Sequence, residues 1–276
     1  MTILSYTFFQ HALIGALFAS VLCAIMGTYV VTRRLVIAGG GMAHASLGGV
    51  GVGAYFGFSP LLGAALFAVA SGFGISRLSG RRTVREDSAI AMLWTFGMAV
   101  GILLAYLTPG FMTDLPSYLF GDILGISRTD LYLLGSLTVV AVIFYAVFRD
   151  AIISIACDRD FAQTQGLPVK FIEGMLTVLV ALTIVGCLHI VGIVMVISLL
   201  SVPQMTATLF VNTYRQMVWL SALLAYIGCV CGLLLSYYAD VPGGACIIIV
   251  SIGIYAAART IKATCLLYTS DAADDK

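Results

Sequence analysis

His44 is the residue of this chain whose type and surroundings point most directly to chemistry. It stands in RRLVIAGGGMAHASLGGVGVGAYFG (33–57), where two arginines precede an apolar run of membrane-spanning length. A histidine inside a membrane span is costly and usually faces a cavity or a partner. Neutral imidazole is a common ligand of divalent transition metals. The pattern favours a metal ligand on a transport path, with a hydrogen-bonded structural histidine as the alternative.

The glycines around His44 indicate close helix packing. Gly40 and Gly48 lie one turn away on either side and leave room beside the imidazole. A second series, spaced by four, predicts a face on which another helix approaches closely. Its members are Gly41, Ala45, Gly49, Gly53 and Gly57.

His189 is a weaker candidate near the predicted outer end of a later apolar run, beside Cys187. Its position suggests a ligand where a metal ion enters the path. The alternative is a histidine at the membrane interface that is satisfied by hydrogen bonds.

The elements that carry these residues are predicted to be membrane helices. The chain has 276 residues, of which 61% are hydrophobic and 10% charged, with a mean hydropathy of +1.07, whereas soluble domains carry about 25% charge. Several apolar runs reach the roughly 20 residues that cross a bilayer as a helix. We therefore expect an all-α, polytopic membrane protein with eight or nine transmembrane helices. The runs are 9–31, 38–57, 60–77, 88–108, 131–148, 173–191, 192–211, 217–238 and 244–261.

The basic residues predict the orientation. With nine spans and the N-terminus outside, Arg128 is the one basic residue of the permease region on the outer side, and the C-terminus is cytoplasmic. The other basic residues then lie inside, at positions 33, 34, 77, 81, 82, 85, 149, 159, 170, 215, 259 and 262.

The last residues, TCLLYTSDAADDK (264–276), break the pattern of the rest of the chain. They are similar to a translated sequencing adapter, so we interpret 1–263 as the transmembrane permease domain and 264–276 as a non-native tail. The native sequence beyond about residue 263 is left open.

The polar segment DRDFAQTQGLP (158–168) is predicted to form a short amphipathic helix on the cytoplasmic side. Phe161, Ala162 and Gln165 have helical spacing, Asp158 stands at the start, and Gly166 ends the helix before Pro168. Such a helix between two spans could dock a cytoplasmic partner. An ordinary polar connector is the alternative.

In order and spacing, six stretches together resemble the zinc/manganese/iron permease family of ABC importers, and the resemblance covers roughly residues 5–262. The stretches are RRLVIAGGGMAHASLGGVG (33–51), REDSAI (85–90), SYLFGDIL (117–124), DRDFAQTQGLP (158–168), HIVGIVMVISLLSVPQMTA (189–207) and LSYYADVPGGACIIIV (235–250).

This resemblance implies a plasma-membrane permease of bacterial type that carries zinc, manganese or iron, with no permanently bound cofactor. The implied partners are a second permease subunit, a cytoplasmic ATPase and an extracytoplasmic metal-binding protein, in addition to membrane lipid and without nucleic acid. Residues 158–168 match the coupling helix that docks on the ATPase. The chain has no G-x-x-x-x-G-K-[ST] phosphate loop, so ATP hydrolysis is assigned to a separate subunit and this chain is not expected to be an enzyme.

One position departs from the family pattern. Many relatives carry an aspartate one turn before the pathway histidine, where this chain has Gly40. The metal and the choice between a homodimer and a heterodimer therefore stay open. A stand-alone metal channel or secondary transporter is the second hypothesis, although it leaves the coupling-like segment unexplained, and an intramembrane enzyme is the third.

Overall fold

The computed structural model describes residues 6–79, 85–110, 118, 119, 121 and 125–274, without the side chains of 79, 189, 190 and 265–274. The regular elements of this described part are all helices, as predicted. They are α1 (Thr7–Thr32), α2 (Val36–Phe56), α3 (Pro60–Ser79), α4 (Glu86–Leu107), α6 (Arg128–Cys157), α7 (Arg159–Thr164), α8 (Val169–Leu199), α9 (Val202–Ala207), α10 (Tyr214–Ala239) and α11 (Gly243–Asp274).

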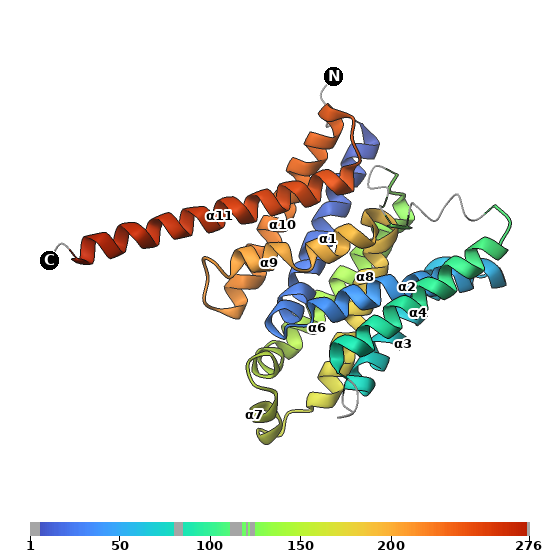
Figure 1. Ribbon diagram of the computed structural model, residues 1–276, viewed down its shortest axis with the longest axis horizontal. Coiled ribbons are helices and arrows are strands. Elements are labelled where there is room, and N and C mark those ends of the chain that lie inside the picture. Colours follow the sequence, from blue (N-terminus) through green and yellow to red (C-terminus); the bar gives the residue numbers. More distant parts are fainter. Residues whose placement is uncertain (1–5, 80–84, 111–117, 120, 122–124, 275–276) are drawn as a thin grey trace.

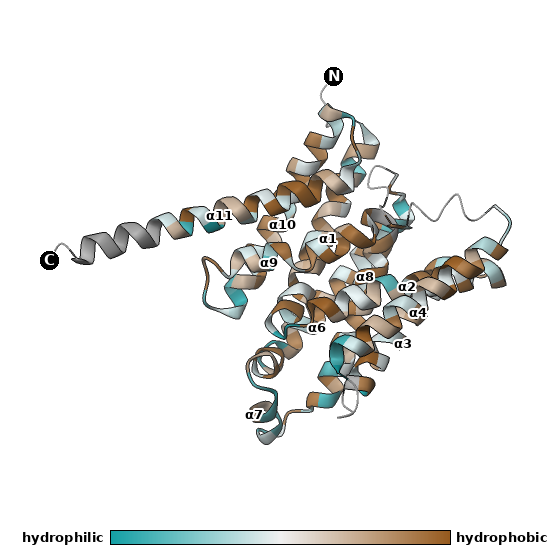
Figure 2. Ribbon diagram, viewed as in Figure 1, coloured by the Kyte–Doolittle hydropathy of each residue, from teal (hydrophilic) through white to brown (hydrophobic). Residues whose placement is uncertain are grey.

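Seven helices in the described residues are long and apolar enough to cross a membrane, and Val191–Ala207 forms a shorter apolar segment. α2 is not among the seven, although its 21 residues reach the length of a span. Its glycines and His44 lower its hydropathy, because small and polar side chains replace apolar bulk. The chain is therefore a polytopic helical membrane protein, and Figure 2 shows hydrophobic residues distributed along the helices.

The helices form two groups that α8 joins. α2, α3 and α4 pack on one another, while α1 packs on α6, α8 and α10 (Figure 1). α8 also contacts α2 and α3. Many of the largest fully buried side chains belong to α1 and α8, so these two helices form the centre of the fold. Examples are Leu22, Met26, Leu176, Ile184 and Leu188.

Two apolar runs end differently from the prediction. The run at 131–148 was predicted to end at residue 148, but α6 bends at Phe148 and continues to Cys157, with Ile152 and Ile155 buried. The predicted boundary between the runs 173–191 and 192–211 is confirmed, because the helix breaks at Gly192, where φ is 76°. The second of these runs is not one straight helix, because α8 ends at Leu199 and α9 begins at Val202.

Several segments predicted to be cytoplasmic meet at one end of the molecule. The end of α1, the start of α2, the end of α3 and the start of α4 lie around one cavity together with α7 and the start of α8. The start of α1 lies toward the opposite end from α7 (Figure 1). This arrangement places His44 on a helix that starts beside the predicted docking segment.

Candidate functional site

α2 follows α1 through a tight turn that starts the site. Arg33 caps α1, Arg34 adopts a left-handed conformation with φ 60°, and Leu35 precedes α2. The Leu35 amide donates to the Val30 carbonyl at 2.7 Å. A non-glycine residue in this region of φ is uncommon, so the turn holds α2 at a defined angle to α1.

The small residues of α2 lie where neighbouring helices approach to backbone distance. A Cβ added at Gly53 would lie 2.7 Å from the Pro60 Cα of α3, and one at Gly49 would collide with the Gly63 carbonyl. Bulk at either position must push α3 away, because backbone cannot rotate out of the contact.

The series spaced by four does not face a single helix. A Cβ at Gly41 would lie 2.6 Å from Ile90 of α4, and the Ala45 backbone lies against Gly97 of the same helix. Gly49 and Gly53 instead meet α3. Four residues advance about 40° beyond one turn at 3.6 residues per turn, so the series turns from α4 toward α3 along α2.

Gly57 does not share this packing. It ends α2 in the left-handed conformation with φ 75°, and a Cβ there would have no neighbour within 4 Å. Glycine suits this position because other residues are strained at positive φ.

A row that was not predicted, Gly48 and Gly51, packs on the Gly97 and Gly101 backbone of α4.

His44 is half-buried on α2 and has a defined orientation. Its Nδ1 lies 2.9 Å from the Gly40 carbonyl oxygen. A carbonyl only accepts, so Nδ1 carries the hydrogen of this bond, and in neutral imidazole the lone pair is on Nε2. The bond lies within one turn of α2, as expected for a structural histidine. It occupies only Nδ1, so Nε2 is the nitrogen available to bind a metal ion.

The departure at Gly40 leaves His44 without an acidic partner one turn earlier. The nearest atom to a Cβ at Gly40 would be Ile197 Cδ1, at 3.8 Å, which is ordinary contact. Among the described residues, no three His, Cys, Asp or Glu side chains cluster in a way that could hold a metal ion. His44 therefore resembles one ligand on a path more than part of a closed metal cage.

His189 lies on α8, three residues before the bend at Gly192. Its side chain is outside the described residues, so its predicted role as a ligand where metal enters stays a prediction.

Within residues 158–168, Arg159–Thr164 form the short capped helix α7. The Asp158 carboxylate accepts hydrogen bonds from the Asp160 and Phe161 amides, both at 3.0 Å. Such an N-cap satisfies amides that would lack partners at a helix start. Ala162 is buried while Phe161 is 57% exposed, so the helix anchors one side and presents an aromatic ring on the other.

The end of α7 is a glycine turn. Gly166 adopts φ 76°, and the Leu167 amide donates back to the Ala162 carbonyl at 3.3 Å. Gln165 caps the helix and is exposed beside this turn. The start at Asp158 and the end at Gly166 are therefore where the sequence predicted them. The side chain of Asp158 forms the first and the positive φ of Gly166 forms the second.

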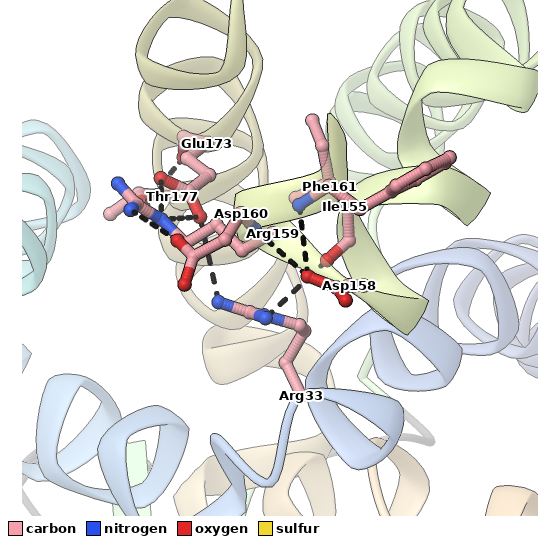
Figure 3. A network of polar contacts seen from close by, with 8 residues as sticks. All are labelled: Arg33, Ile155, Asp158, Arg159, Asp160, Phe161, Glu173 and Thr177. Carbon is pink, nitrogen blue, oxygen red and sulfur yellow. Dashed lines mark hydrogen bonds and ion pairs between the residues drawn. The ribbon is translucent and has the colours of Figure 1, made fainter. Parts of the chain in front are cut away.

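A charged cluster joins α7 to two long helices (Figure 3). Arg159 Nε lies 2.9 Å from Glu173 Oε1 and 3.1 Å from Oε2, and Arg33 Nη2 lies 3.5 Å from the same Oε1. Arg33 Nη1 also donates to the Ile155 carbonyl at 3.3 Å. The hydrogen bond and the charge of Glu173 raise the pKa of Arg159 above its usual value. Glu173 therefore bridges α7, α8 and the α1–α2 turn.

A cavity of about 350 Å3 lies beside this cluster. Arg33, Arg159 and Glu173 line it, together with Glu86 and residues of α2 such as Gly39 and Met42. It therefore combines charged groups from the α7 end with the small-residue surface of the helix that carries His44.

The sequence interpretation missed Glu173 and Trp94. Glu173 is the one acid of the run 169–199, and an acid at the edge of an apolar run is a signal of pairing. Trp94 gave no signal beyond its type, because aromatic residues are frequent throughout the chain. In the structure, the ring of Trp94 stacks on the imidazole of His44.

Comparisons with known proteins show the family of the chain. Residues 5–262 match the ABC 3 transport family. The chain is 34% identical to the "Manganese transport system membrane protein MntC" of Halalkalibacterium halodurans, over 93% of this chain and 88% of that protein. It is 30% identical to the "Probable iron transport system membrane protein" of Haemophilus influenzae, over 89% and 90% of the two chains.

The fold is also similar to a solved structure, "PsaBC from Streptococcus pneumoniae in complex with Fab". The TM-score is 0.85 at 26% identity, and the match covers 93% of this chain and 92% of that one.

Proposed function

The chain belongs to the ABC 3 transport family, and we propose that it is the membrane permease subunit of an ATP-driven importer for a divalent transition-metal ion. The observation that carries the proposal is the half-buried imidazole of His44, whose Nε2 is free of the Gly40 hydrogen bond, on a helix of a polytopic membrane fold. Manganese, iron and zinc all accept such a ligand, and the names of the relatives include manganese and iron.

The proposed assembly contains two permease subunits, two cytoplasmic ATPase subunits and an extracytoplasmic metal-binding protein in a bacterial-type plasma membrane. The N-terminus is proposed to lie outside and the C-terminus inside. The capped α7 with its exposed Phe161 supports an ATPase contact at the same end as the Arg33–Glu173–Arg159 cluster. The transported ion is the cargo, and no permanent cofactor is proposed.

The cavity beside this cluster is the proposed inner vestibule of the path. Its carboxylates, Glu86 and Glu173, would attract a departing cation, while Arg33 and Arg159 limit how tightly it is held. An ion that must be released into the cell is better served by weak contacts with carboxylates and nearby cationic groups than by a closed set of ligands.

The test of this function is uptake into proteoliposomes that contain the permease and its ATPase. We expect uptake of radioactive manganese, zinc or iron to require both subunits and hydrolysable ATP. Equal uptake by the permease alone would favour a stand-alone channel or secondary transporter instead.

Replacing Phe161 with aspartate should weaken ATPase docking. The ring is exposed at the surface of α7, and a charge there removes the apolar contact without disturbing the buried Ala162. We expect the yield of ATPase that co-purifies with the permease to fall by about tenfold, since burial of one large aromatic side chain contributes roughly 1.5–3 kcal/mol. Tyr132→Asp, at an exposed aromatic near the start of α6, is the control and should leave this yield unchanged. Equal yields for both variants would contradict a docking role for α7.

Replacing Glu173 with glutamine should separate docking from transport. The variant keeps the Phe161 surface but loses the charge that ties Arg159 to Arg33, so α7 motion no longer reaches the α1–α2 turn. We expect unchanged ATPase co-purification and a fall of about twofold to thirtyfold in metal transported per ATP hydrolysed. Asp87→Asn, which removes an exposed carboxylate that does not line the cavity, should retain the ratio. An unaltered ratio in Glu173→Gln would show that the cluster does not transmit the motion.

A further inference from the structure

The ring of Trp94, on α4, lies directly against the imidazole of His44, on α2. The ring centroids are 4.1 Å apart and the ring planes differ by 24°, which is a stacked arrangement. The Trp94 indole Nε1 donates to Met98 Sδ at 2.9 Å, one turn later on the same helix. The indole is thus held at its edge while its face covers the imidazole.

The close approach of α2 and α4 makes this contact possible. A Cβ at Gly97 would lie 2.5 Å from the Ala45 Cα, and one at Gly51 would lie 2.5 Å from the Gly101 carbonyl oxygen. His44 immediately precedes Ala45, and Trp94 lies one turn before Gly97. Glycine contacts between the backbones therefore set the separation of the two rings, and α2 and α4 run side by side in Figure 1.

The stack and the hydrogen bond restrict different motions of His44. The bond from Nδ1–H to the Gly40 carbonyl fixes the tautomer and one edge of the ring. The indole covers one face of the imidazole and restricts tilting of that ring, because a tilted imidazole would collide with the indole. Together they leave Nε2 as a lone-pair donor that points in one direction, which lowers the ordering cost of binding a metal ion.

We propose that Trp94 is a positioning residue that holds the His44 imidazole ready to bind the transported divalent cation through Nε2. This inference rests on the proposed function and adds a residue from a second helix to its metal path. Trp94 itself supplies no ligand atom, because its one nitrogen carries a hydrogen and is a donor only. Its effect should therefore appear in metal affinity more than in assembly.

Fluorescence of Trp94 offers a direct test that does not depend on transport. The chain has two tryptophans, and the other, Trp219, lies on α10 and is 71% exposed. In Trp219→Phe, the Trp94 emission alone reports on the site. We expect cobalt(II), a paramagnetic ion that accepts imidazole ligands, to quench this emission in a saturable manner in the full chain in lipid nanodiscs.

Two controls assign the signal. Adding His44→Ala to Trp219→Phe should abolish saturable quenching, and Trp94→Phe, which retains only Trp219, should show none. Equilibrium dialysis with cobalt(II) on the same samples measures binding independently. Bound cobalt that requires His44 but leaves Trp94 unquenched would overturn the inference and leave the proposed function intact, whereas absence of cobalt binding would overturn both.

Uptake by the assembled importer tests the positioning role. Trp94→Leu keeps apolar volume but removes the ring, and we expect the metal concentration for half-maximal uptake to rise by about tenfold to a hundredfold, the usual effect of losing a group that orients a ligand. Trp94→Phe should restore most of the affinity because it retains a stacking face. Unchanged half-maximal concentration in Trp94→Leu, together with lost uptake in His44→Ala, would refute the role of Trp94 alone.

Discussion

His44→Ala should reduce metal uptake by at least about tenfold while leaving the importer assembled. A bare divalent ion on this path would lose one of few ligands other than water, and a single ligand or its support is worth about tenfold to a hundredfold in metal affinity. The hydrogen bond of the half-buried ring stays within its own helix, to Gly40. The substitution therefore breaks no hydrogen bond between helices, and the backbone contacts of α2 with α4 remain although the stack on Trp94 is lost. Radiometal uptake and co-purification of the ATPase measure the two outcomes.

The matched control is His11→Ala. His11 is also half-buried, with Nδ1 3.3 Å from the Ile126 carbonyl oxygen, but it lies near the start of α1 at the other end from the charged cluster. It should retain uptake. If His44→Ala transports manganese, zinc and iron at the original rate, the histidine is structural.

The same assay can test an acid at position 40. Gly40→Asp places a carboxylate one turn before His44, and its Cβ fits in ordinary contact with Ile197. A second ligand should change the preference among metals or slow release, because affinity and geometry then depend on an imidazole–carboxylate pair.

Gly49→Ala should destabilise the protein although it adds one methyl group. The new Cβ would meet the backbone carbonyl of Gly63, so α2 and α3 must separate, and overpacking of this kind costs about 1–3 kcal/mol or more. We expect a clear loss in the midpoint of thermal unfolding in detergent and in the yield of assembled complex, with Gly49→Leu failing to assemble.

Gly253→Ala is the control for this effect. Gly253 lies on α11 and is exposed, and an added Cβ there would have no neighbour within 4 Å. Alanine is the better helix former by about 1 kcal/mol, so this variant should be neutral or more stable. Equal thermal midpoints for Gly49→Ala and Gly253→Ala would show that α2 and α3 are not held at backbone contact.

The α7 segment could be predicted almost completely because its determinants are local. The carboxylate of Asp158 caps amides two and three residues ahead, and Gly166 supplies positive φ at the end. The membrane class was predictable for a similar reason, since the length and polarity of each run decide whether a helix can cross a bilayer. Residues 173–211 are too many for one span, and the break falls at Gly192, where glycine tolerates a positive φ.

The small-residue series of α2 could be predicted only in part. Close packing follows from glycine content, but the partner helix does not. The series meets α4 at Gly41 and α3 at Gly49, and Gly57 leaves the contact to end the helix. Residue spacing defines a face of one helix and contains no information on which neighbour lies over it.

The sequence by itself determined that this chain is a helical membrane protein. It also predicted His44 as a ligand on a metal path and residues 158–168 as a short docking segment. The tertiary structure alone decided that Trp94 stacks on His44 and that Glu173 binds both Arg33 and Arg159. Helical periodicity and capping act over a few residues and can be read along the chain. The ring stack and the charged cluster join residues of different helices, and their distances depend on how tightly those helices pack.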